Sequence, residues 1–75
     1  MSYSDECPWY VRIRYERLYL GLSQSEAAEK MGFDERTLRT WEAGTHFPGY
    51  PGRRALCQLY GKSLQELGLF IPPNY

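Results

Sequence analysis

A polar stretch at residues 34–44, DERTLRTWEAG, carries the side chains with the clearest chemistry in this chain. An Asp opens it and a Gly closes it, which predicts a capped helix over 34–43. At 100° per residue, one face of that helix is expected to point toward a core: Asp34, Leu38 and Trp41. The opposite face is expected to point outward: Arg36, Arg39, Thr40 and Ala43. Guanidinium and hydroxyl groups on one exposed helix face can bind base edges or phosphates, so this face is a candidate binding surface.

Other kinds of site find little support in the sequence. The two cysteines, Cys7 and Cys57, lie fifty positions apart without a CxxC spacing, and His46 is the one histidine, so no set of zinc ligands is expected. Cys57 sits among apolar neighbours and is interpreted as a small buried thiol. Because no acid–base or nucleophile constellation accompanies these residues, we expect neither an enzyme nor a cofactor.

Bulk composition indicates one small globular domain. The chain has 75 residues, of which 43% are hydrophobic and 24% charged. No apolar run approaches the ~20 residues that span a bilayer. The acidic, aromatic start, MSYSDECPWY, is wrong for a secretory signal, so a cytoplasmic location is expected. Nine basic and nine acidic residues give zero net charge, which counts against nucleic-acid binding until the clustering of the arginines is considered.

Start and stop signals divide the chain into five short helices, an all-α fold. Pro8 suits a first helical turn, and that helix is expected to end at Gly21. SQSE, from Ser23, is a capping box for a second helix that ends at Gly32. Asp34 is expected to cap the third helix.

The last third of the chain contains two more helix signals. GTHFPGYPG is rich in Gly and Pro and predicts a loop, followed by a fourth helix over roughly 52–60. SLQE, at residues 63–66, is a second capping box that opens a short fifth helix. FIPPNY cannot continue a helix because of its two prolines. We therefore expect an N-terminal extension over 1–7, one domain over 8–69, and a tail or linker over 70–75.

RIRYERLYLGLSQSEAAEKMGFDERTLRTWEAG, at residues 12–44, resembles the helix-turn-helix of the lambda-repressor-like, or XRE, family. That family has an Arg in its first helix, then Gly-Leu-Ser-Gln, a central Ala, a turn Gly, and a recognition helix ending in an aromatic or aliphatic residue, Glu and Gly. The corresponding residues here are Arg17, GLSQ at 21–24, Ala28, Gly32 and WEAG at 41–44. The segment that follows looks most like N-terminal modules of multidomain regulators from actinobacteria.

The resemblance implies a DNA-binding domain of a transcriptional regulator that inserts its third helix into the major groove of double-stranded DNA. The base-reading residues would be Glu35, Arg36, Arg39 and Thr40. The residues at the DNA backbone would be Gln24, Thr37, Thr45, His46, Arg53 and Arg54. It also implies a mostly buried ion pair between Arg17 and Glu42, which would explain a carboxylate at the edge of the inward face.

An alternative remains open, in which the same fold is a protein–protein interaction module that uses its aromatic residues and the loop over 47–50. Glu16 departs from the family pattern, because many members place Leu there. A neutral module is expected to bind DNA weakly by itself, so a homodimer or attached C-terminal domains are expected partners. Neither a membrane nor a metal is expected to take part.

Overall fold

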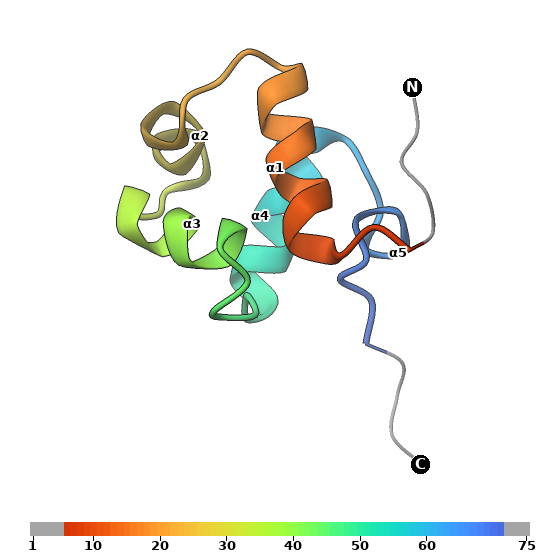
Figure 1. Ribbon diagram of the computed structural model, residues 1–75. Coiled ribbons are helices and arrows are strands. Elements are labelled where there is room, and N and C mark those ends of the chain that lie inside the picture. The colour runs from red at the N-terminus through yellow and green to blue at the C-terminus, as the bar shows by residue number, and fades with distance from the viewer. Residues whose placement is uncertain (1–5, 72–75) are drawn as a thin grey trace.

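The computed structural model describes residues 6–71, and this part of the chain is entirely helical, with no strand. Its five helices are α1 (Trp9–Tyr19), α2 (Gln24–Met31), α3 (Glu35–Glu42), α4 (Tyr50–Tyr60) and α5 (Leu64–Leu67). Figure 1 shows α2 and α3 side by side at one end, with α1 and α4 between them and α5. The all-α fold of five short helices expected from the sequence is confirmed.

Local hydrogen bonds set the ends of α2 and α5. At the start of α2, the Ser23 hydroxyl accepts from the backbone N–H of Glu26 at 3.0 Å, and the Glu26 carboxylate accepts from the backbone N–H of Ser23 at 2.9 Å. The same reciprocal box opens α5 with Ser63 and Glu66. Gly32 ends α2 with φ of 80°, a left-handed conformation that side chains disfavour. Both predicted capping boxes and the Gly32 stop are confirmed.

The turn into α3 is as short as the sequence indicates, with one difference. Asp34 caps the helix, because its carboxylate accepts from the backbone N–H of Arg36 at 2.9 Å. Its side chain is exposed, so the expectation that Asp34 points toward the core is wrong. A side chain that caps a helix turns back to the free N–H groups of the first turn and cannot also reach the core.

Helix α4 begins two residues earlier than the sequence predicts. Gly49 is its N-cap residue, and Pro51 lies in the first turn, where a missing N–H costs no hydrogen bond. Gly52 is buried in this helix, and a Cβ atom there would lie 2.6 Å from the indole ring of Trp41. Pro51 and Gly52 therefore lie inside α4, and the glycine allows this helix to pack closely on α3.

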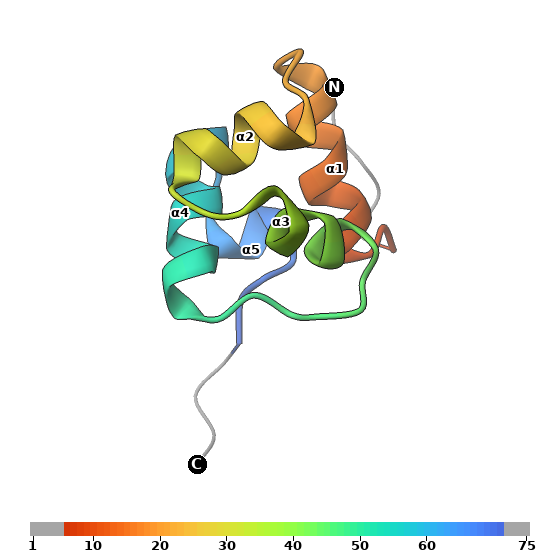
Figure 2. The ribbon, with the colours of Figure 1, turned by 90° about the vertical axis from the view of Figure 1, so that its left-hand side faces the viewer.

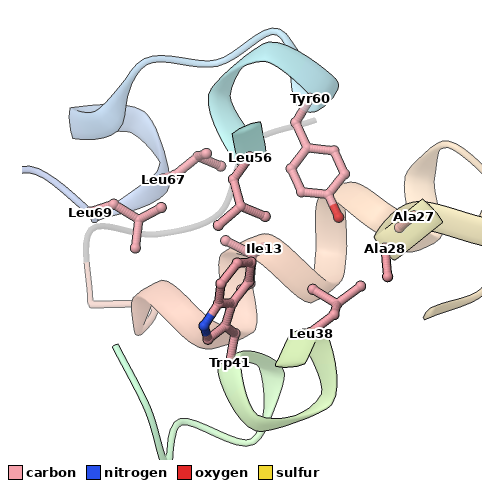
Figure 3. Close-up of a cluster of buried hydrophobic side chains, with 9 residues drawn as sticks. All are labelled: Ile13, Ala27, Ala28, Leu38, Trp41, Leu56, Tyr60, Leu67 and Leu69. Atoms are coloured by element: carbon pink, nitrogen blue, oxygen red, sulfur yellow. The ribbon is translucent and has the colours of Figure 1, made fainter. Parts of the chain in front are cut away.

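All five helices contribute to one core, which holds α3 from below. Figure 3 shows Ile13 of α1 between Leu38 and Trp41 of α3 and Leu56 of α4. Ile13, Leu38 and Leu56 are completely buried, and Trp41 is 5% exposed. The aliphatic members add about 1.5 to 3 kcal/mol each by leaving water. Because Leu38 and Trp41 point inward, the opposite face of α3 must point to solvent.

Candidate nucleic-acid interface

The outward face of α3 carries the side chains that the sequence singles out. Arg36 and Arg39 are exposed, and Thr40 is half-buried. Figure 2 looks onto α2 and α3, with the loop that follows α3 passing beneath it toward α4. The two arginines therefore lie on a surface that no other helix covers.

Glu35 and Arg39 are joined on this surface. Arg39 Nη2 donates to Glu35 Oε2 at 2.8 Å, across one turn of α3, and both side chains are substantially exposed (58% and 43%). Pairs of this kind stabilise a helix by only about 0.3 to 0.5 kcal/mol. The Glu35–Arg39 pair matters more for binding than for stability, because the carboxylate orients the guanidinium and competes with any phosphate or base for it.

Two threonine hydroxyls, one in α3 and one just after it, have their single hydrogen engaged. The Thr40 hydroxyl donates to the Thr37 carbonyl oxygen at 2.7 Å, and the Thr45 hydroxyl donates to the Thr40 carbonyl oxygen at 3.0 Å. A hydroxyl has one hydrogen, so Thr40 and Thr45 present acceptor lone pairs and methyl groups to a ligand. Thr40 is thus suited to accept from a base amino group or to contact a thymine methyl group.

A buried ion pair under α3 joins its end to α1. Arg17 Nε donates to Glu42 Oε2 at 2.7 Å, and Arg17 Nη2 donates to Glu42 Oε1 at 2.9 Å. Arg17 Nη1 also donates to the Leu22 carbonyl oxygen at 2.9 Å. The Glu42 side chain is 3% exposed, and its hydrogen bond raises the pKa of Arg17. This two-pronged geometry fixes the angle of α3 relative to α1.

Gln24 lies directly above this pair, at the start of α2. Its Nε2 atom donates to Glu42 Oε1 at 3.1 Å, which leaves one amide hydrogen and the carbonyl oxygen for a ligand. Arg14, Gln24 and Arg39 line one shallow groove over Arg17 and Glu42. Arg14 was not among the site residues predicted from the sequence. Its position three residues before Arg17 places both on one face of α1, and that spacing is the signal that was missed.

A second hollow of about 400 Å³ lies on the other flank of α3, between that helix and the loop after it. It is lined by Arg36, Thr37, Thr40, Trp41, His46 and Phe47. The structure therefore brings His46 next to the outward face of α3. Thr45 joins the same surface through its bond to Thr40.

Arg53 and Arg54 are not among the residues that line either hollow. The Arg53 guanidinium lies over the Phe47 ring, 5.6 Å from its centre, and this cation–π contact holds it against the loop. Arg54 is exposed on α4. Their roles at a DNA backbone stay predictions.

Within residues 6–71 no three His, Cys, Asp or Glu side chains gather as a metal site would require. No helix in this part of the chain has the length and apolar character of a membrane span.

Comparison with known proteins identifies a family for this chain. A family model described as a helix-turn-helix domain covers residues 11–70, which is most of the chain. A search of curated proteins finds no match. The matched residues include the α2–turn–α3 unit, the core beneath it and the Arg17–Glu42 pair. The chain therefore belongs to the helix-turn-helix domain family, whose members are typically DNA-binding and not enzymes.

Proposed function

We propose that this chain is a sequence-specific DNA-binding module of the XRE, lambda-repressor-like type, and that it acts in transcriptional regulation. In this proposal α3 enters the major groove of double-stranded DNA, with its first two turns against the base edges. Membership of the helix-turn-helix domain family supports DNA binding in general. The finer assignment rests on the side chains of α3.

One observation carries the proposal: the core and an ion pair hold the inner face of α3, and no other helix covers its outer face. Leu38 and Trp41 anchor it in the core, and Glu42 ties its last turn to Arg17. Arg36 is exposed, and its guanidinium has no hydrogen bond or ion pair within residues 6–71. A rigid helix with a free guanidinium is suited to read bases, since pre-organisation lowers the entropy cost of binding.

Each side chain proposed to contact a base has a distinct role. Arg36 donates to O6 and N7 of a guanine, the commonest specific contact in the major groove. Glu35 and Arg39 act as one unit, in which the carboxylate points the guanidinium or accepts from a cytosine amino group. Thr40 accepts a hydrogen bond or packs on a thymine methyl group, because its own hydrogen is engaged.

The residues around α3 would hold the phosphates. Gln24 and Arg14 lie on one flank, and His46 lies on the other with Thr37 and Thr45. Phosphate contacts give register and affinity but carry no sequence information. With zero net charge, the domain has little attraction to DNA beyond these contacts, so its non-specific binding should be weak and salt-dependent.

Fluorescence anisotropy tests the proposal. The protein is titrated against a randomised duplex pool at low salt, a preferred site is selected, and binding to that site is repeated at rising salt. We expect Arg36→Ala to lose about 5- to 150-fold in affinity for the selected site. Lys30→Ala is the matched control, because it removes the same charge from an exposed site at the end of α2. Absence of binding at low salt, or equal losses in both variants, would overturn the proposal.

A protein–protein interaction module is the second candidate, and exposed aromatic residues favour it. Phe47 is 44% exposed, although its ring packs edge-on against Trp9 of α1 at 5.2 Å, and Tyr50 is 62% exposed. Large exposed apolar side chains often mark protein contacts. A chain that does not bind DNA but self-associates, or whose Tyr50→Ser variant loses a protein partner, would point to this function.

A further inference from the structure

A small cavity lies away from the surface around α3, and no residue of α3 lines it. Its volume is about 150 Å³, and it lies between the last turns of α1 and the end of α4. It is lined by Tyr15, Glu16, Tyr19, Leu20, Tyr60 and Lys62, and no residue of α2 or α3 lines it. We call it the Glu16 pocket.

Glu16 is the unusual residue of this pocket. It is only 5% exposed, and within residues 6–71 no ion pair joins its side chain to a cation, although its carboxylate oxygens are not among the atoms that are buried from water. Arg17 beside it already serves Glu42. A carboxylate removed from water is costly unless a cation or several donors face it. Glu16 therefore has no cationic partner in the described chain, and its oxygens meet solvent in this pocket.

Lys62 lines the same pocket but does not supply that partner. No ion pair within 4 Å joins it to Glu16. Its charge also acts on Glu66, whose pKa is lowered first by hydrogen bonds to the Ser63 backbone and side chain and then by Lys62. The carboxylate of Glu16 thus faces a pocket in which no cation within 4 Å pairs with it, and a cation from outside the chain would meet it there.

Aromatic rings form the walls. Tyr15 and Tyr19 stack with their ring centres 6.3 Å apart and their planes 15° from parallel. Tyr60 closes the third side, and its hydroxyl is buried without a hydrogen-bond partner in the described chain. Aromatic faces attract cations through their quadrupole, most strongly when water is excluded. Rings around a carboxylate are the surroundings that an organic cation prefers over a hydrated metal ion.

We propose that the Glu16 pocket binds an organic cation, an alkylammonium or guanidinium group. The volume is about five times that of a water molecule in the liquid, which accommodates either group. The cation is carried by a free small molecule or by a Lys or Arg side chain of a partner protein. Leu18 and Tyr19, which are 61% and 71% exposed, would extend the contact in the second case. Because no lining residue belongs to α3, this site and the DNA surface can be occupied together.

Titrations followed by two-dimensional ¹H–¹⁵N NMR test this proposal without DNA. Methylguanidinium and tetramethylammonium are the small-molecule probes, and a blocked tripeptide with a central arginine between leucines is the protein-like probe. We expect dissociation constants on the order of 1 mM for the free cations, with shifts at Tyr15, Tyr19 and Lys62. If the tripeptide binds at least about tenfold more tightly, the source is a protein partner; equal affinities indicate a small molecule.

Variants decide whether the pocket itself is responsible. Glu16→Gln keeps the shape and removes the charge, and should weaken binding by about tenfold or more. Tyr19→Leu, at a largely exposed position, should weaken it by about two- to fivefold. Glu29→Gln is the control, since it removes the same charge from an exposed site on α2 and should change nothing.

Two results would overturn the proposal. The first is the absence of saturable shifts in the parent protein, or equal shifts in Glu16→Gln. The second is binding that appears only in Lys62→Met, because Lys62 would then be the cation that fills the pocket. Circular dichroism melts accompany each variant, so a loss of binding in a folded protein is distinguished from unfolding.

Discussion

Glu42→Gln should destabilise this domain more than any other single change of one charge. The substitution preserves the size and shape of the side chain, but places an amide NH₂ group or a neutral oxygen against two Arg17 donors. It also removes the negative charge to which Gln24 donates. Arg17, only 8% exposed, would keep its charge without a counter-ion.

The magnitude follows from the burial of the pair. Breaking a buried ion pair by removing one partner costs about 3 to 5 kcal/mol, because the remaining charge is stranded. A domain of this size has a total stability of roughly 4 to 11 kcal/mol, so this one change removes a large fraction of it. The melting temperature should fall by about 15 °C or more, given the 4 to 8 °C per kcal/mol typical of small domains.

Urea unfolding, followed by tryptophan fluorescence, measures the effect, since buried Trp41 adjoins the substituted residue. Glu35→Gln is the matched control within α3: it breaks the exposed pair with Arg39 and should cost about 0.5 kcal/mol or less. Replacing both buried partners together, by Arg17→Met with Glu42→Leu, should cost much less than Glu42→Gln alone. The reasoning fails if Glu42→Gln loses less than about 1 kcal/mol, the value of an exposed pair.

Three further changes should alter stability in different directions. Gly52→Ala should destabilise by about 1 to 3 kcal/mol, because its Cβ atom would lie 2.6 Å from the buried Trp41 ring, and calorimetry should show the lower melting temperature. Glu16→Leu should raise the free energy of unfolding in urea, by about 1 kcal/mol or more, since it replaces an unpaired buried carboxylate. The carboxylates of Glu26 and Glu66 have lowered pKa values, mainly through hydrogen bonds to Ser23 and Ser63. Their contribution to the free energy of unfolding is therefore complete above the ordinary glutamate pKa of about 4.3 and is lost as the pH falls below it. Unfolding measured between pH 6 and acid should therefore show a smaller loss when both are changed to Gln.

Each of these predictions has its own check. An unchanged melting temperature for Gly52→Ala would mean that α4 shifts away from Trp41 at little cost. Reduced stability of Glu16→Leu would show that Glu16 is paired in solution. Glu29→Gln provides the acid control for the capping glutamates, because it is exposed but belongs to no capping box. An equal loss of stability toward acid in the parent protein and in the double variant would refute this link between the pKa values and stability.

Helix ends were predictable here because their causes are local. The contacts of Ser23 with Glu26 and of Asp34 with Arg36 span two or three residues, so residue types in a short window suffice to predict them. The inward face of α3 was predictable for a similar reason, since Leu38 and Trp41 follow the helical period. Asp34 follows the same period but belongs to the cap, and periodicity alone does not distinguish the two.

Contacts between helices were harder to foresee. The bond from Gln24 to Glu42 joins residues eighteen positions apart and depends on the angle at which α2 crosses α3. The close packing of α4 on α3 depends on Gly52 meeting Trp41, which no local signal contains. Glu16 was recognisable as a departure from a pattern, but its burial without a partner required the position of Tyr60 on another helix.

If α3 reads DNA as proposed, its length limits how much sequence one copy can specify. Eight residues at 1.5 Å each give a helix of about 12 Å, which lies alongside only about four base pairs at 3.4 Å each. A particular run of four base pairs occurs by chance about once in 256 positions, whereas a genome offers roughly a million or more competing sites. One copy therefore cannot single out one binding site in a genome. Two copies spaced one turn of DNA apart would square that selectivity, and attached domains that bring copies together would have the same effect.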